Sequence, residues 1–168
     1  MKKLFIIGLA SFFGIISTAQ SATFMSAEWG TDACAAWNAS DTLTTGLGGE
    51  WADNNGGRGH KVIQMYNMDC SDAPTTEMRI SSQDGKAMCT YGGAVENSDL
   101  DKGTDYIMFA KAKNWAKMGS GKDGPMKAMS FGRLKFKGPK MEAMSVMGPF
   151  GAFLKLTGEI GGDPAACQ

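Results

Sequence analysis

Methionine is the residue type in this sequence whose number and spacing most suggest chemistry. The 168 residues include 13 methionines. Met126 and Met129 are three residues apart. Met141, Met144 and Met147 repeat that spacing, which places each set on one face of a predicted helix. Thioether sulfur is a soft ligand that selects Cu(I), so one hypothesis is a periplasmic copper-binding protein that uses Met141, Met144 and Met147.

An apolar cavity is the competing interpretation of these methionines, and we favour it. Methionine is flexible and polarisable, and it therefore lines cores and adaptable apolar cavities. The methionines stand among Phe131, Phe150, Phe153 and Leu154 rather than among polar residues, and no histidine accompanies them. We expect neither a resident metal nor a cofactor.

The sequence carries no pattern that predicts an enzyme. His60 is the only histidine, and no Gly-x-Ser-x-Gly elbow accompanies it. The segment 119–122 (GSGK) resembles a phosphate-binding loop, but Asp123 stands where a Ser or Thr should hold magnesium. Acidic residues at 99–105 fit a solvated turn. We therefore predict no catalytic residues.

The pattern of the amino-terminal residues 1–22 predicts a signal peptide. Two lysines precede a short apolar run over residues 4–16, and small residues follow. We expect cleavage after Ala19, with Ser21 and Ala22 as the alternative sites. The run is too short to span a membrane. Residues 23–168 are then a single domain that is exported, to the periplasm of a Gram-negative bacterium or into the medium.

The charge of the exported part argues against a nucleic-acid partner. The whole chain has 17 basic and 17 acidic residues, and removal of the two amino-terminal lysines leaves 15 and 17, a net charge of −2. Binding to phosphate backbones requires a basic surface.

Four cysteines, Cys34, Cys70, Cys89 and Cys167, predict two disulfides in an exported chain. Nesting Cys70–Cys89 inside Cys34–Cys167 closes the shortest inner loop. A tight hairpin at residues 84–85 argues against that pairing, because it separates Cys70 from Cys89. The pairing stays open.

Hydrophobic periodicity predicts an α+β domain in which strands come first and helices gather late. The segment 133–137 (RLKFK) alternates apolar and basic residues, as a half-buried strand does. We expect a helix over 26–38, a glycine-rich loop over 46–59, strands over 61–68, 75–81, 86–91 and 105–112, short helices over 114–118 and 125–129, the strand 133–137, and an apolar helix from Pro139 that is interrupted at 148–149.

The segment 132–138 (GRLKFKG), between a short helix and an apolar helix, resembles the carboxy-terminal half of the sterol carrier protein-2 (SCP-2, non-specific lipid-transfer) domain. The strand 105–113 (DYIMFAKAK) and the turn after it fall in the expected order. The resemblance implies a five-stranded mixed sheet with helices on one face that enclose a hydrophobic tunnel. It also implies binding or transfer of fatty acyl lipids, sterols or similar molecules without catalysis.

The resemblance further implies which residues contact the lipid. The expected tunnel residues are Met126, Met129, Phe131, Met141, Met144, Met147, Phe150, Phe153 and Leu154. The implied partner is a hydrophobic small molecule, with transient membrane contact and no nucleic acid; a protein partner is not predicted. A third hypothesis is an interaction module that docks a protein through the apolar carboxy-terminal helix.

Overall fold

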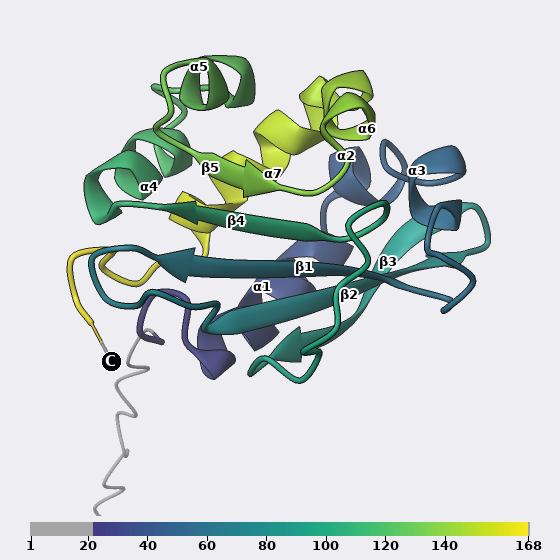
Figure 1. The fold of residues 1–168 in the computed structure, drawn as a ribbon, viewed down its shortest axis with the longest axis horizontal. Helices are drawn as coiled ribbons and strands as arrows, with labels where there is room; N and C mark the ends of the chain where they lie inside the picture. Colours follow the sequence, from purple (N-terminus) through teal and green to yellow (C-terminus); the bar gives the residue numbers. More distant parts are fainter. Residues whose placement is uncertain (1–21, 168) are drawn as a thin grey trace, which may run out of the picture.

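The strand β1 (Lys61–Asn67), with every residue buried, lies at the centre of the sheet. The computed structural model describes residues 22–167, so the predicted signal segment lies outside it except for Ala22. Within the described residues the sheet has five strands in the order β3-β2-β1-β4-β5 (Figure 1). β1 pairs in parallel with β4 (Tyr106–Ala110), whereas the other neighbours are antiparallel. The sheet is therefore mixed, as expected.

The hairpin between β2 (Thr76–Gln83) and β3 (Lys86–Gly93) is the one predicted from Asp84-Gly85. Asp84 has φ 50° and Gly85 has φ 74°, and two consecutive left-handed residues match the twist of the strands that they join. The opposite edge of the sheet is β5 (Lys135–Lys137), which is shorter than the predicted strand.

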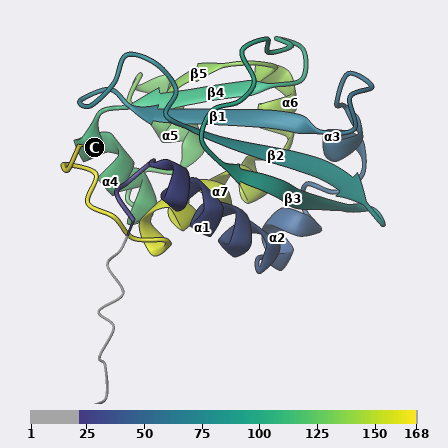
Figure 2. The same ribbon diagram turned by 90° about the horizontal axis from the view of Figure 1, so that it is seen from below.

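Helices cover one face of the sheet, which confirms the predicted fold class (Figure 2). Ile63, Met65, Met78 and Met108 point to this side and belong to the core. The helices are α1 (Ala27–Asn38), α2 (Asp41–Thr44), α3 (Glu50–Asp53), α4 (Ala112–Gly119), α5 (Pro125–Ser130), α6 (Lys140–Ser145) and α7 (Met147–Glu159). Within residues 22–167 none of the helices is long and apolar enough to cross a membrane.

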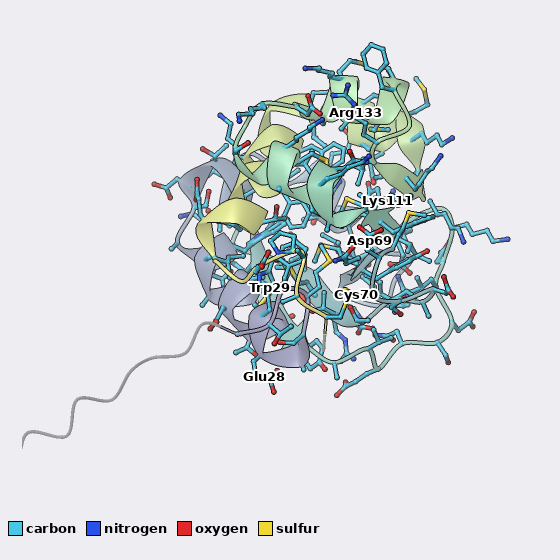
Figure 3. The ribbon with its side chains drawn as sticks, turned by 90° about the vertical axis from the view of Figure 1, so that its left-hand side faces the viewer. Glu28, Trp29, Asp69, Cys70, Lys111 and Arg133 are labelled. Atoms are coloured by element: carbon cyan, nitrogen blue, oxygen red, sulfur yellow. A yellow bond between two sulfur atoms is a disulfide. The ribbon has the colours of Figure 1, made fainter. Side chains whose placement is uncertain are left out.

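The described cysteines form two disulfides, as predicted, and the structure settles their pairing. Cys34 of α1 bonds to Cys89 of β3, and Cys70 after β1 bonds to Cys167 near the carboxyl end. The nested pairing of Cys70 with Cys89 and of Cys34 with Cys167 is therefore not the one that forms. Figure 3 shows Cys70 at the end of the sheet beside Asp69. One bond therefore fixes α1 on the sheet, and the other fixes the last residues of the chain.

The apolar carboxy-terminal region differs from its prediction in where it breaks. α6 ends at Ser145 and α7 begins at Met147, so the break is at Val146 rather than at Gly148-Pro149. Pro149 lies in the first turn of α7, where a missing N–H leaves no helical hydrogen bond unmade. The glycine-rich segment 46–59 also differs, because it contains the short helix α3.

The apolar side of α7 packs inside the molecule. Phe150, Phe153, Leu154 and Leu156 are all at most 7% exposed. This side of α7 therefore has no room for the docked protein of the third hypothesis.

A long connection between β3 and β4 (residues 94–105) crosses the other face of the sheet, where Glu77 anchors it. Glu77 is fully buried and accepts hydrogen bonds from the backbone N–H of Asn97 (2.9 Å) and from Gln64 Nε2 (3.0 Å). Arg79 Nε adds an ion pair at 2.9 Å. A charged residue inside a strand thus binds the connection to the sheet.

Candidate functional site

A cavity lies between the sheet and the helices, and every layer of the fold contributes to its wall. Its volume is about 30 Å³. Apolar and aromatic side chains make up the wall: Trp37, Leu47, Trp51, Ile63, Tyr106, Met108, Phe136, Ala143, Val146, Phe150 and Phe153. The strands supply Ile63, Tyr106 and Met108 because residues two apart point to the same face of a strand.

Contacts between aromatic rings define the shape of this wall. Trp51 of α3 stacks on Tyr106 of β4, with centroids 5.9 Å apart and planes at 10°. Trp37 meets Phe153 of α7 edge to face at 5.7 Å. Offset stacks and edge contacts of this kind are the favoured arrangements of aromatic pairs. The rings hold α1, α3 and α7 at the cavity.

The cavity is too small for an acyl chain in this closed form. A volume of about 30 Å³ admits one or two water molecules. Ala143 and Val146, which come from α6 and its junction with α7, form one side of the wall, which we call the cover. A ligand of that size therefore requires part of the wall to move outward, and the burial of each methylene then contributes about 0.8 kcal/mol.

A polar and charged cluster adjoins the cavity beside Trp51 and Tyr106. The side chain of Lys61 is fully buried, and its Nζ lies 3.0 Å from Oε1 and Oε2 of Glu142 on α6. The Tyr106 hydroxyl also donates to Glu142, and Trp51 Nε1 donates to that hydroxyl at 3.0 Å. Asn54 completes the group, since its Nδ2 donates to Glu142 Oε1 at 2.6 Å.

Burial has the largest effect on the pKa values of Lys61 and Tyr106 in this cluster. It lowers the pKa of Lys61, and the hydrogen bonds and charge of Glu142 offset only part of that change. Burial, followed by the hydrogen bond and negative charge of Glu142, raises the pKa of Tyr106 well above its usual range. Tyr106 is thus held as a neutral hydroxyl that donates a hydrogen bond.

The structure brings together only some of the residues expected at the tunnel. Phe150 and Phe153 line the cavity, and Leu154 is buried in the core beside it. Met129 and Met147 are partly buried against that core.

Four other expected tunnel residues lie on the outer surface and do not line this cavity. Met126 is 53% exposed, Phe131 71%, Met141 78% and Met144 45%. Because α6 turns Glu142 and Ala143 inward, Met141 and Met144 share the opposite face. Their contact with a ligand stays a prediction.

The methionine row also departs from the copper hypothesis in its geometry. Met141 and Met144 belong to α6, whereas Met147 begins α7 after the break, so the three do not share one continuous helix. Among residues 22–167 there is no group of three or more His, Cys, Asp or Glu side chains that could hold a metal. Copper binding through methionine stays untested by the fold.

Sequence reasoning missed most of the cavity wall. Alternation in the strands carried a signal for Ile63, Tyr106 and Met108. Trp51 gave a weaker sequence signal, because it is a single large apolar residue inside a stretch assigned to a loop. Glu142 gave no sequence signal, since its partner Lys61 is 81 residues away.

The acidic turn before β4 is also more ordered than expected. Asp105 is 2% exposed, pairs with Arg58 at 2.6 Å and accepts the backbone N–H of Val62 at 2.8 Å. It therefore joins β4 to the start of β1 instead of being a solvated turn residue.

The fold is shared with solved structures of sterol carrier proteins. A conserved hypothetical protein from Thermus thermophilus, described as possibly a sterol carrier protein, matches with a TM-score of 0.51 at 15% identity, over 88% of this chain and 96% of its own. A crystal structure of sterol carrier protein 2 matches with a TM-score of 0.51 at 16% identity, over 82% of this chain and 98% of its own. At such identities the likeness concerns the fold alone.

Sequence similarity, rather than the shared fold, identifies the family of this chain. None of the curated proteins compared with the chain matches it. Residues 52–151, more than half of the chain, match the SCP-2 sterol transfer family. These residues include the end of α3, all five strands of the described sheet and the cover of the cavity. The chain therefore belongs to the SCP-2 sterol transfer family.

Proposed function

We propose that this protein binds and carries a hydrophobic molecule, a fatty acyl lipid, a sterol or a similar compound, without acting on it chemically. The observation that carries the proposal is the aromatic and aliphatic cavity under the sheet, whose cover is the short helix α6 and its junction with α7. Membership of the SCP-2 sterol transfer family supports it. The cavity wall supplies desolvation, and a binding protein needs no further chemistry.

Export belongs to the same proposal. The pattern of residues 1–22 and the two disulfides support a mature protein, residues 23–168, that works in the periplasm of a Gram-negative bacterium or is secreted. In that setting a carrier exchanges its ligand with membranes.

Membrane contact is proposed at one edge of the molecule, which we call the basic edge. It comprises the cations of residues 111–140 and the exposed Met126, Phe131, Met141 and Met144. Nine of the 17 basic residues of the chain fall between 111 and 140, and Asp123 is the only acid there. Lys127 and Arg133 pair with that acid. Cations beside exposed apolar side chains complement an anionic lipid surface.

Native mass spectrometry of the exported protein, followed by organic extraction, tests the carrier function. We expect a bound mass that extracts as acyl lipid or sterol, on a polypeptide that begins between residues 20 and 23. A protein that binds copper in fixed stoichiometry and ignores added lipid contradicts the proposal and supports the methionine site.

A matched pair of variants ties the ligand to the cavity. Val146→Asp places a carboxylate in the wall, at a half-buried position between two helices that tolerates it better than the core does. Ser145→Asp places the same charge at an exposed position of α6, one residue away. We expect the first variant to lose its lipid and the second to keep it, both with the wild-type circular dichroism spectrum. Lipid retention by a folded Val146→Asp variant would show that the ligand lies elsewhere.

A further inference from the structure

In the polar cluster beside the cavity, the hydrogen-bond donors belong to the sheet and to the end of α3, which we call the body of the protein, whereas the carboxylate that they bind belongs to the cover. Lys61 is in β1, Tyr106 in β4, and Asn54 follows α3. Glu142 is in α6. Lys61 Nζ also donates to the backbone carbonyl of Asn54 at 2.7 Å. The body thus holds a preformed set of donors for a carboxylate, and in the closed form Glu142 occupies it.

This donor set adjoins the space that a ligand would occupy. Trp51 and Tyr106 are walls of the cavity, and Lys61 Nζ lies 4.9 Å and 5.4 Å from the centroids of their rings. The side chain of Lys61 is 0% exposed and that of Glu142 is 17% exposed. Glu142 is therefore the member of the pair that can reach solvent.

Opening the cover separates this ion pair. If the cavity widens on the side of Ala143 and Val146, α6 moves away, and that movement withdraws Glu142 from Lys61. A buried cation that loses its partner is strongly unfavourable, because nothing replaces the lost charge and hydrogen bonds. A ligand with an anionic end restores them, and a neutral ligand of the same length does not.

We propose that Lys61, Tyr106 and Asn54 form the recognition site for the carboxylate of a long-chain acid, and that Glu142 is an internal substitute that occupies this site when no ligand is bound. This inference rests on the proposed carrier function and specifies its ligand class. Binding exchanges one carboxylate for another: the ligand takes the donors, Glu142 moves toward solvent, and the acyl chain fills the widened cavity. Because of this exchange, the outward movement of α6 depends on the carboxylate of the ligand.

Two probes of equal chain length test the exchange, hexadecanoate and hexadecanol, each delivered from cyclodextrin to the purified full-length mature protein. We expect the wild type to bind the acid at least about tenfold more tightly than the alcohol, because hydrogen bonds to charged groups are the stronger ones. Glu142→Gln removes the competing carboxylate and keeps a side chain of the same size. It should bind the acid about tenfold more tightly still, with a smaller change for the alcohol.

Lys61→Met should bind the alcohol and lose the preference for the acid. If this variant does not fold, the pair Lys61→Met with Glu142→Leu replaces both charges by apolar groups, a change that proteins often tolerate. An independent readout uses hexadecanoate labelled with ¹³C at the carboxyl group. In the wild type its carboxyl should titrate at lower pH than the free acid, and in the variant without Lys61 this difference should disappear.

The outcomes separate this inference from the carrier function. If the wild type binds both probes with equal affinity, or if the acid preference survives removal of Lys61, the cavity carries lipid but the carboxylate site is wrong. If Glu142→Gln leaves acid binding unchanged, Glu142 is not a competitor and the exchange is wrong. If the wild type binds neither probe nor any other lipid, the carrier function fails and this inference fails with it.

Discussion

At the scale of single residues, Glu77 shows how a buried charge can organise a connection. Burial by itself raises the pKa of this carboxyl. Hydrogen bonds from the backbone of Asn97, from Gln64, from the Asn97 side chain and from Arg79 outweigh that effect, and the pKa of Glu77 in the folded protein is lowered. The carboxylate therefore stabilises the fold when ionised, and protonation removes that contribution.

The pH dependence of the protein's stability follows from this lowered pKa. Above the unfolded pKa of about 4.3 the contribution is fully present, and it is lost as the pH falls through the lowered folded pKa. Glu77→Gln should cost roughly 1–3 kcal/mol at neutral pH, since it leaves buried donors without a charged acceptor. Its stability should then change less between pH 5 and pH 2 than that of the wild type, as measured by urea unfolding.

Glu96 provides the matched control for Glu77. It pairs with the same Arg79 at 2.6 Å, but its side chain is 56% exposed. Exposed pairs contribute little, so Glu96→Gln should retain the acid dependence of the wild type. Equal pH profiles for the wild type and Glu77→Gln would show that another carboxylate governs acid unfolding.

At the scale of elements, the two disulfides differ in what they hold. Cys34–Cys89 joins α1 to β3 and has a sequence separation of 55, whereas Cys70–Cys167 has a separation of 97. Loop entropy alone favours the longer loop by only about 0.5 kcal/mol. Cys89 is buried at 6% exposure, while Cys70 and Cys167 lie at the surface. Packing should therefore decide which bond stabilises more.

Paired replacement by alanine tests this order. Removing Cys34 and Cys89 should cost about 3–5 kcal/mol, because α1 loses its attachment to the sheet, and removing Cys70 and Cys167 about 2 kcal/mol. Denaturant unfolding measures the free energies, and hydrogen exchange should report loosening in α1 for the first variant only. A larger loss in the second variant would mean that the carboxyl end carries more of the stability than its exposure indicates.

The elements also show how far local pattern predicts this fold. Strands β1, β2 and β3 and their hairpin were predicted within a few residues, because alternation and turn chemistry act over neighbouring positions. The break at Val146 was not predicted. The residues around it, Ala143, Val146 and Phe150, line one cavity, and distant residues build the rest of that cavity.

Local sequence pattern likewise predicts only part of the candidate site. Regular spacing correctly grouped Met141 with Met144, but spacing does not say which face of α6 points inward. That choice depends on Lys61, which the fold brings to Glu142 from 81 residues away. Buried polar pairs between distant segments leave no mark in local periodicity, so the charged cluster beside the cavity could be found only from the structure.

At the scale of the whole molecule, balanced charge conceals a strongly uneven distribution. The chain has equal numbers of basic and acidic residues, yet the basic edge concentrates nine cations in residues 111–140. β5 forms one edge of the sheet, and α5 and α6 flank it (Figure 1). Arg133 lies at one end of the molecule and Glu28 of α1 at the other (Figure 3). This asymmetry can orient the cover of the cavity toward an anionic surface.

Vesicles of phosphatidylglycerol and phosphatidylcholine in equal parts test the basic edge. Lys135→Glu with Lys137→Glu changes two exposed residues of β5. Each juxtamembrane cation contributes roughly 1 kcal/mol, so the double variant should bind these vesicles at least about 30-fold more weakly. Wild-type binding should also fall as salt rises from 0.01 M to 0.15 M, where the screening length drops to about 8 Å. Lys86→Glu makes half of that charge change at an exposed position of β3, the sheet edge opposite β5, and should leave binding within about twofold of the wild type. An equal loss per unit of charge in the two variants would mean that net charge, rather than the basic edge, draws the protein to the membrane.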